Sequence, residues 1–334
     1  MNSPVEAQHD TPLLEVRGLK VHFPVRGGLG RKNNRVVKAV DGLDFFLRKG
    51  ETLSLVGESG CGKSTTGYAL LGMLKPTAGE IFFEGKKLDS QDREGRRIAR
   101  DRFQIVFQDP FASLNPKMSI GDSIGEPLRV SGTDRRQCRA RVEELLELVG
   151  LHPSYYDRLP NQFSGGQRQR IVIARALAVR PSLIVCDEPV SALDVSIRSQ
   201  ILNLLIRLQR ELNIAYLFIS HDLSVVRHIS DRVAVMYLGH IVELAESREL
   251  FRQALHPYTK ALFSAIPLPD PEIKHRRRLI LSGDLPSPLN PPPGCPLVTR
   301  CPNRRPECEK ALPPLRELRP GHFVACGRAE ELEN

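Results

Sequence analysis

The feature that most limits the possible folds of this chain is the glycine-rich segment GESGCGKST at residues 57–65. It follows the short apolar run ETLSLV, typical of a buried strand, and precedes TGYALLGML, which has a helical pattern. A strand, a glycine loop and a helix in this order provide the context that the pattern G-x-x-x-x-G-K-[ST] requires. The segment therefore predicts a phosphate-binding loop within an α/β fold.

Each residue type in this loop suits phosphate binding. Glycines let the backbone turn and bring its N–H groups against phosphate oxygens, and the following helix N-terminus adds partial positive charge. Lys63 can bridge the β- and γ-phosphates, the Ser64 hydroxyl can ligate Mg²⁺, and Thr65 can bond the α-phosphate. The predicted nucleotide-binding residues of the loop are Gly57, Ser59, Gly60, Cys61, Gly62, Lys63, Ser64 and Thr65.

A pair of acids follows a second apolar run, in the segment PSLIVCDEP. Leu183 to Cys186 fit a parallel strand that is buried on both faces, and open α/β sheets bind ligands at the carboxyl ends of such strands. Asp187 then becomes a candidate Mg²⁺-side carboxylate, and Glu188 is placed to polarise the water that attacks the γ-phosphate. Two adjacent acids can also form an ordinary solvated turn, but the phosphate loop favours the catalytic interpretation.

A second exposed helix start precedes the acid pair, in the segment FSGGQRQRIVIARAL. Ser164, Gly165, Gly166 and Gln167 form a second small-residue, phosphate-binding surface in the same chain. One nucleotide does not need two such surfaces from one protomer. We therefore expect two chains to sandwich ATP, each offering its serine-glycine segment to the other's phosphates.

With these segments, the sequence resembles the ATP-binding cassette (ABC) family over about residues 12 to 265. FSGGQ is similar to the family signature LSGGQ, with Phe163 in the leucine position. The resemblance implies that Gln108 in IVFQDP is the glutamine that senses Mg²⁺ and water, and that His221 in LFISHDLS contacts the γ-phosphate. SALD, residues 191–194, matches the segment that crosses the dimer interface. Phe23 resembles the aromatic residue that stacks on adenine, although a core phenylalanine is the alternative.

The resemblance also implies an organisation. We expect a P-loop NTPase core with an antiparallel β subdomain, within an ATP-binding domain at residues 12–255, and a helical subdomain at about 111–165. The segment RRQCRARVEELLELVGL contributes an amphipathic pattern there. An insertion, RGGLGRKNN, lengthens the connection after Phe23. From residue 256 to 334 the composition shifts, through a linker and the basic run 276–278, to a small cysteine-rich extension.

Composition narrows the function classes only slightly. Hydrophobic residues make up 41% and charged residues 26% of the 334, as in soluble globular proteins. No uncharged apolar stretch reaches the roughly 18 residues of a membrane helix, and the N-terminus does not have the pattern of a secretion signal, so a cytoplasmic location is expected. The formal charge of +9 suits a nucleic-acid binder, and equally a protein that works on phosphates or beside an anionic membrane.

Three further segments, VSALDVSIRSQILNLL, HPYTKALFSAIP and LSGDLPSPLNPPPGC, resemble ATP-binding subunits of bacterial dipeptide and oligopeptide importers. That resemblance implies a peripheral ATPase on the cytoplasmic face of the inner membrane. It implies pairing with a related ATPase subunit beneath two membrane permease subunits. A periplasmic peptide-binding protein would deliver the peptide to those permease subunits. Importers of glutathione, a haem precursor or nickel remain alternatives. So does an ABC ATPase that acts on nucleic acid or ribosomes, although the single cassette and dispersed basic residues disfavour it.

The extension carries Cys295, Cys301, Cys308 and Cys326, separated by five, six and seventeen residues. Four thiols in a short, proline-rich segment suggest a metal site, because disulfides are rare in the cytoplasm. Spacing leaves Zn²⁺ and a [4Fe–4S] cluster both open. The resemblance to the C-terminal extension of the importer subunits implies the cluster. Cys61, Cys138 and Cys186 are interpreted as small apolar fillers.

Overall fold

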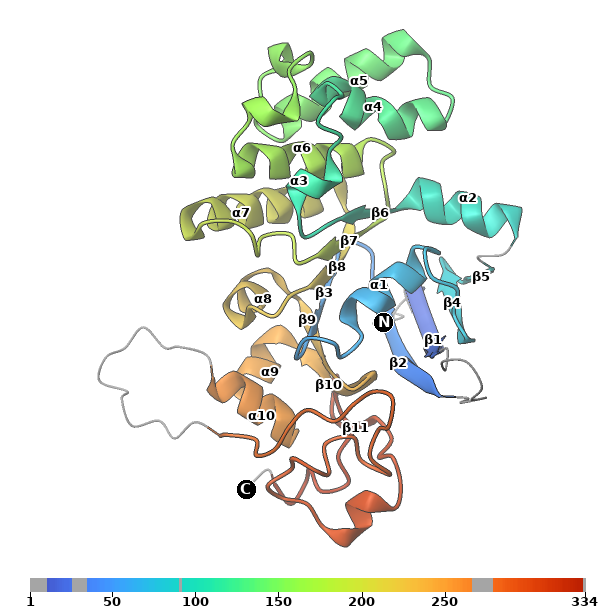
Figure 1. The fold of residues 1–334 in the computed structure, drawn as a ribbon, viewed down its shortest axis with the longest axis vertical. Helices are drawn as coiled ribbons and strands as arrows, with labels where there is room; N and C mark the ends of the chain where they lie inside the picture. The colour runs from blue at the N-terminus through green and yellow to red at the C-terminus, as the bar shows by residue number, and fades with distance from the viewer. Residues whose placement is uncertain (1–10, 26–34, 90–91, 266–278, 333–334) are drawn as a thin grey trace, which may run out of the picture.

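The computed structural model describes residues 11–25, 35–89, 92–265 and 279–332. Its strands form two sheets, and its helices lie around the larger sheet and at one end of it (Figure 1). The insertion at 26–34 and the basic run at 276–278, which the sequence singled out, lie outside the described residues. Among the residues that are described, no helix combines the length and the apolar character needed to span a membrane.

The larger sheet has eight strands and forms the centre of the fold. Five of them are parallel neighbours, and the buried apolar sequences of β3, β7 and β8 reflect cover on both faces. In spatial order the strands are β11 (Arg316–Arg319), β12 (His322–Val324), β10 (His240–Glu246), β9 (Arg232–Tyr237), β3 (Thr52–Val56), β8 (Ala215–Ile219), β7 (Leu183–Asp187) and β6 (Phe103–Val106).

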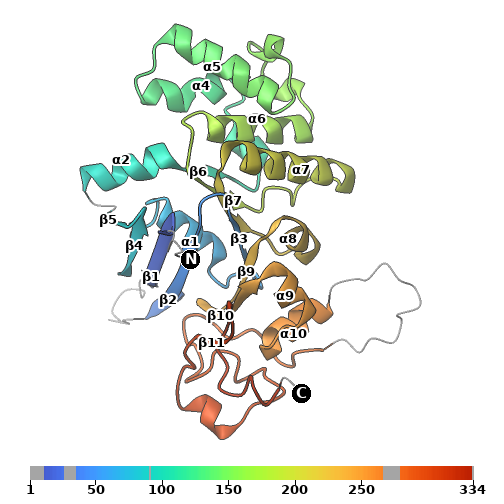
Figure 2. The same ribbon diagram turned by 180° about the vertical axis from the view of Figure 1, so that it is seen from behind.

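The smaller sheet is antiparallel and confirms the expected β subdomain. Its strands, in order, are β2 (Val36–Leu47), β1 (Leu14–Pro24), β4 (Ala78–Phe83) and β5 (Lys86–Leu88). Its apolar face shares one buried cluster with β3 and with helix α1 (Lys63–Leu70). The β subdomain therefore packs directly against the strand and helix that flank the glycine loop, as seen from behind in Figure 2.

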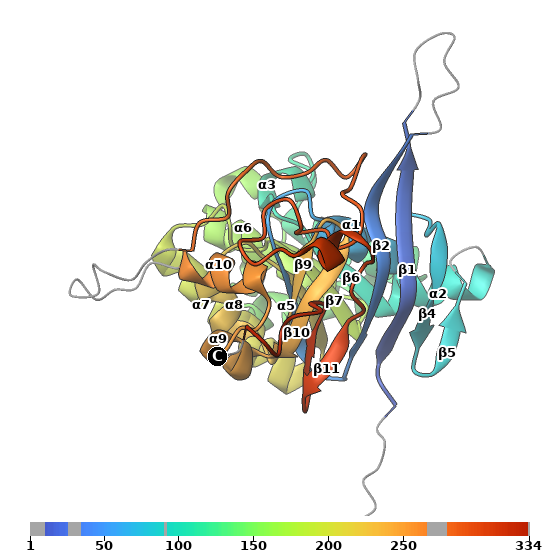
Figure 3. The ribbon, with the colours of Figure 1, turned by 90° about the horizontal axis from the view of Figure 1, so that it is seen from below.

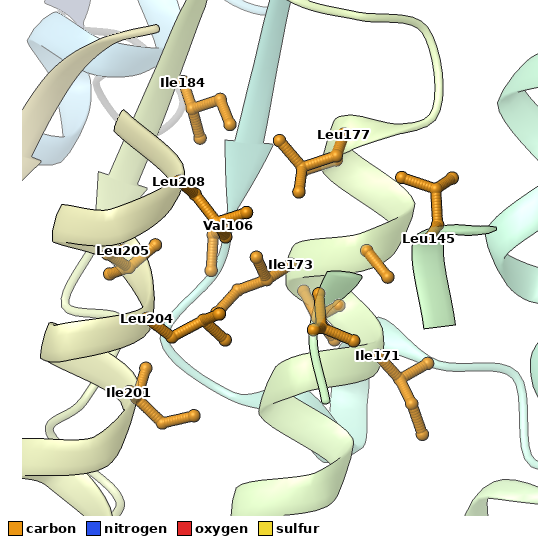
Figure 4. Packing of buried hydrophobic residues seen from close by; sticks show 14 of the residues in the cluster. Val106, Leu145, Ile171, Ile173, Leu177, Ile184, Ile201, Leu204, Leu205 and Leu208 are labelled. Atoms are coloured by element: carbon orange, nitrogen blue, oxygen red, sulfur yellow. The ribbon is translucent and has the colours of Figure 1, made fainter. Parts of the chain in front are cut away.

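The helical subdomain lies at one end of the molecule (Figures 1 and 2). It comprises α3 (Pro110–Ser113), α4 (Ile120–Val130), α5 (Arg135–Leu148), the 3-10 turns η1 (Pro153–Tyr155) and η2 (Pro160–Gln162), and α6 (Gly165–Leu177). The amphipathic pattern predicted for α5 is confirmed, because Val142, Leu145 and Leu146 are fully buried. Figure 4 shows α6 between α5 and α7 (Val195–Leu212), so one apolar core joins the subdomain to the sheet.

The remaining helices surround the central sheet or extend from it. They are α2 (Arg93–Arg102), α8 (Leu223–Ile229), α9 (Ser247–Arg252), α10 (Pro257–Ser264) and the 3-10 turn η4 (Pro306–Glu309). The segment HPY suits the start of helix α10. His256 caps the helix by accepting a hydrogen bond from the Tyr258 backbone N–H, and Pro257 occupies the first helical position, which proline favours.

The cysteine-rich extension is more closely joined to the core than the sequence suggested. Strand β12 pairs with β10, so the hairpin β11–β12 lengthens the central sheet (Figure 3). Behind this pairing, the fully buried carboxylate of Glu243 accepts from the backbone N–H groups of Leu255 and His256 and lies 2.7 Å from His322 Nε2. The sequence predicted a small appended extension but not this pairing of β12 with β10, because the pairing depends on residues far apart in the sequence.

Candidate functional site

The glycine loop lies between β3 and α1, as predicted, and its glycines have conformations that other residues rarely adopt. Gly57, Gly60 and Gly62 have φ values of 151°, 80° and 105°. A Cβ atom at Gly62 would lie 2.2 Å from the carbonyl oxygen of Ala39 in β2. The positive φ values and this close approach explain why glycine occupies these positions.

Lys63 folds back over the loop. Its Nζ donates to the carbonyl oxygens of Gly57 at 2.8 Å and Glu58 at 3.0 Å, and its side chain is buried. A buried ammonium needs such partners, because burying an unpaired charge is costly. These two carbonyls hold the cation at the loop, where it can transfer its bonds to phosphate oxygens.

The structure also brings the acid pair to this loop, from the end of β7. Ser64 Oγ donates to Asp187 Oδ1 at 2.9 Å, which joins the two predicted Mg²⁺-side groups directly. Tyr68 donates to the other carboxylate oxygen at 2.9 Å, and burial together with this bond raises its pKa to about 12. The phenol therefore stays protonated at neutral pH and keeps the Asp187 carboxylate in place. Hydroxyl and carboxylate oxygens are the ligands that Mg²⁺ prefers.

Glu188 and His221 meet in the same site, next to Asp187. His221 Nδ1 lies 2.9 Å from Glu188 Oε1, and the glutamate has a φ of 48°, which is unusual for this residue type. Such a backbone is costly away from functional positions and directs the side chain out of the strand axis. The His221 side chain is largely exposed, so it can reach a ligand. This pair has the geometry of a general base and a group that orients it.

Lys63, Ser64, the acid pair and His221 line one cavity of about 560 Å³. The residues that the sequence proposed and that the cavity brings together are Ser59, Gly60, Gly62, Lys63, Ser64, Thr65, Gln108, Asp187, Glu188 and His221. Ala39 of β2 also lines it, and the sequence gave no signal for that residue. Tyr68 was missed as well, although its position four residues after Ser64 places both on one face of α1.

The serine-glycine segment does not line this cavity in the same chain. Ser164 caps α6: its hydroxyl accepts from the Gln167 backbone and the Gln167 side chain accepts from the Ser164 N–H, so the helix start is held by a capping box. Phe163 is buried and makes an edge contact with Tyr155, with ring centroids 5.5 Å apart. Gly165 and Gly166 open the helix itself, and a Cβ on Gly166 would lie 2.5 Å from Ile197 Cγ2.

Phe23 lies near the end of β1, opposite Val37. Its side chain is 39% exposed, so it is not the core phenylalanine that the sequence left open as an alternative. It is not among the residues that line the cavity. An adenine-stacking role for Phe23 stays a prediction.

The four cysteines of the extension line a second cavity, of about 380 Å³. Burial raises the pKa of Cys295 to about 11 and also raises the pKa values of Cys301 and Cys326, while backbone N–H groups at Leu297, Asn303 and Arg328 lower them. Those N–H groups favour thiolates once a cation is present. Within the described ranges, no group of three or more His, Cys, Asp or Glu side chains is arranged to hold a single metal ion.

The other three cysteines are buried and apart from this cavity. Cys186 lies in β7, where burial raises its pKa. Cys138 contacts the Gly125 carbonyl from α5 at 3.6 Å. Cys61 is a buried residue of the glycine loop itself, with its sulfur 3.7 Å from Lys63 Nζ, and does not line the nucleotide cavity. Their positions fit apolar fillers.

Comparison with known proteins identifies two family models along the chain. The ABC transporter model matches residues 40–191, which contain the glycine loop, the serine-glycine segment and the acid pair. A second model, for the C-terminal region of oligopeptide/dipeptide transporters, matches residues 242–308. The first match contains most of the residues that line the cavity at the glycine loop, and the second contains Cys295, Cys301 and Cys308, whereas His221 and Cys326 lie outside both.

Several relatives match over nearly the whole chain. The oligopeptide transport ATP-binding protein OppF of Escherichia coli is 51% identical, over 96% of this chain and 97% of its own length. The putative oligopeptide transport ATP-binding protein YkfD of Bacillus subtilis is 54% identical, over 94% and 95%. The dipeptide transport ATP-binding protein DppF of Escherichia coli is 48% identical, over 98% of each.

Solved structures with the same fold have lower identity. CbiO1 of Clostridium perfringens, part of the ABC transporter complex cbiONQ, superposes with a TM-score of 0.63 at 29% identity, over 72% of this chain and 91% of that one. The dimeric ATP-binding cassette MJ0796, bound to ADP and Pi, superposes with a TM-score of 0.61 at 29% identity, over 70% and 99%.

Proposed function

This chain belongs to the ABC transporter family and is an ABC ATPase, as its motifs predicted, and from this premise we propose that it powers peptide import. The observation that carries the proposal is the C-terminal match to oligopeptide/dipeptide transporters, together with relatives of that function at about half identity over nearly the whole chain. Its place would be the cytoplasmic face of the bacterial inner membrane.

The proposed reaction is hydrolysis of Mg²⁺-ATP. Backbone N–H groups of the glycine loop and Lys63 bind the phosphates, and Ser64 and Asp187 hold the oxygen ligands for Mg²⁺. Glu188 takes a proton from the attacking water, and His221 orients Glu188 and reaches the γ-phosphate. Gln108 lines the same cavity, where its side chain would sense the bound Mg²⁺ and the attacking water. Bound Mg²⁺ supplies neutralisation of phosphate charge.

The complete site requires a second chain. The serine-glycine segment lies outside the cavity of its own chain and presents a helix N-terminus, which is suited to another protomer's phosphates. We propose that the partner is a related ATPase subunit and that the pair works beneath two membrane permease subunits. A periplasmic peptide-binding protein delivers the peptide to these permease subunits. Domains at residues 12–255 and 256–334 remain our proposed division.

Coexpression with candidate permease subunits and a related ATPase subunit from the same genome tests the assignment. The chain should copurify with a related ATPase subunit and two membrane proteins. In nanodiscs, peptide with its binding protein should raise ATP hydrolysis, whereas the isolated chain should be a poor ATPase. Peptide-independent turnover at full rate by the isolated chain would contradict the proposal, and stimulation by glutathione or nickel alone would change the substrate class.

We also propose that the four-cysteine cavity holds a [4Fe–4S] cluster. Its support is that four thiols line one cavity and that three of them receive backbone N–H contacts that favour thiolates. A zinc ion would need its sulfur ligands about 2.3 Å from one point. Among the described side chains no group of three or more His, Cys, Asp or Glu is arranged to hold a metal ion, so the choice of the cluster over zinc rests on the resemblance to the importer subunits.

The cluster is tested by anaerobic purification of the full chain. A cluster predicts brown protein, broad absorbance near ~400 nm and about four irons per chain. Cys301→Ser should lose the colour and Cys138→Ala should keep it, since Cys138 lies in the helical subdomain. Colourless protein with one zinc per chain would replace the cluster by the alternative metal.

A further inference from the structure

Glu58, within the glycine loop, has every polar group engaged, and two of its four partners come from beyond the nucleotide-binding motifs. Its backbone N–H donates to Tyr258 Oη at 2.9 Å, and its carbonyl oxygen accepts from Lys63 Nζ and from the Cys61 backbone N–H. Its carboxylate accepts from Arg300 Nη1 at 3.0 and 3.2 Å. Helix α10 and the cysteine-rich extension therefore hold this loop residue in place.

Glu58 does not line the nucleotide cavity, although the next residues, Ser59 and Gly60, do. Its role in the described contacts is therefore positional. The Glu58 carbonyl also fixes Lys63 Nζ, which must turn toward phosphate oxygens when ATP binds. A small displacement of Glu58 would move both the loop backbone and the lysine, and misplacement of such groups is costly for binding.

Arg300 connects this residue to the four-cysteine cavity. It immediately precedes Cys301, and the backbone N–H groups of both residues donate to the Leu297 carbonyl, so they share one turn. The Arg300 side chain is only 12% exposed, and Nη1 also lies 3.4 Å from Tyr237 Oη. Moving Cys301 therefore moves a nearly buried guanidinium whose carboxylate partner belongs to the phosphate loop.

We propose that Arg300 is a positioning residue that couples the four-cysteine cavity to ATP binding. The turn that places Cys301 at its cavity is the turn that places Arg300 on Glu58, so filling that cavity and binding ATP favour the same loop conformation. The identity of the group in the four-cysteine cavity rests on the proposed function, whereas the contact between Arg300 and Glu58 is independent of what that cavity holds. Coupling of this kind is reciprocal, so ATP must also stabilise the occupied cavity.

The first test measures ATP affinity of the full-length chain with a fluorescent ATP analogue. Arg300→Met should weaken binding by about tenfold, within the range typical of coupled sites. Arg300→Lys should restore part of the affinity, because it keeps the charge. Arg304→Met is the matched control, since Arg304 is an exposed arginine of the same extension, and it should bind ATP as the wild type does. Iron content should be unchanged in all three variants.

A double-mutant cycle and a reciprocal measurement complete the test. Glu58→Gln should weaken ATP binding as Arg300→Met does, and the double variant should be no worse than either single one, because both remove one contact. ATP should slow loss of iron to a chelator in the wild type but not in Arg300→Met. If the protein holds no iron, the labelling rate of the four thiols replaces iron loss.

These outcomes separate the two proposals. Absence of iron refutes the cluster and leaves the coupling to be decided by the affinities and the thiol-labelling rates. Unchanged ATP affinity in both Arg300→Met and Glu58→Gln overturns the coupling. Additive losses in the double variant, or equal protection by ATP in Arg300→Met, also overturn it.

Discussion

The nucleotide cavity and the four-cysteine cavity, two of several among the described residues, are built differently. The nucleotide cavity lies at the carboxyl ends of parallel strands and is lined by groups from the glycine loop, the start of α1, the end of β7 and the loops that follow β6, β7 and β8. The cysteine cavity is lined mostly by apolar and thiol side chains from turns near η4 and β12. The glycine loop with its flanking strand and helix has a strong local sequence pattern. The four-cysteine cavity is indicated in the sequence mainly by one residue type, cysteine, and by the spacing of those cysteines.

The largest expected effect falls on the nucleotide cavity alone. Glu188→Gln cannot take a proton from water, so hydrolysis by the assembled transporter should fall by roughly 10²–10⁴-fold while ATP binding is kept. Lys63→Ala, the contrasting variant, should weaken ATP binding itself. Phosphate release and nucleotide affinity, measured side by side, check both. Hydrolysis near the wild-type rate in Glu188→Gln would show that another group is the base.

The same variant sharpens the comparison between the cavities. Glu188→Gln should leave iron content unchanged, because its side chain lies in the nucleotide cavity and not in the cysteine cavity. Loss of iron in this variant would show that the two cavities are linked through catalytic residues, rather than through Arg300.

A second prediction tests how firmly the cysteine-rich extension is joined to the core. Glu243→Gln should lower the free energy of unfolding by about 3 kcal/mol. The buried carboxylate accepts several hydrogen bonds, whereas the NH₂ group of the glutamine amide would face N–H groups that are themselves donors. Glu249→Gln is the matched control. Its pair with Arg319 also joins the extension to the core, but is nearly one-third exposed, so it should cost less than about 1 kcal/mol.

Urea unfolding and limited proteolysis measure this difference. The Glu243→Gln variant should be cut first within the extension, since strand β12 loses the buried contact of His322. Equal stability of the two variants would indicate that the β10–β12 pairing does not depend on the buried carboxylate.

Most residues that line the cavity at the glycine loop are ones that the sequence proposed, because their segments have local signals, whereas Ala39 has none. Glycine positions with positive φ, an apolar strand and a helix start specify the loop, and Asp187 follows a strand whose burial is evident from its composition. Phe163 illustrates the limit of a family pattern: its burial beside Tyr155 explains how the signature tolerates an aromatic residue.

The contacts that join the cysteine-rich extension to the core had no such signal. Glu58 and Arg300 are separated by 242 positions, and Glu243 and His322 by 79. Neither pair has a periodicity or spacing that a single sequence reveals, because tertiary packing alone brings them together. The serine-glycine segment shows another limit, since its proposed phosphate partner lies on a different chain.

The smallest expected effect tests whether cysteines outside the extension serve only as packing. Cys138 is buried in α5, and a Cβ added at Gly125 would lie 2.7 Å from its sulfur. Cys138→Ala removes one sulfur from this contact and leaves a small cavity, so it should lower the stability by about 1 kcal/mol. Iron content and ATP affinity should stay at wild-type values, measured by iron assay and nucleotide titration beside urea unfolding. A loss of iron in this variant would contradict the separation of the thiols into two groups, because the described contacts of Cys138 are packing within the helical subdomain and one weak S–H···O contact with Gly125 of α4 (Ile120–Val130).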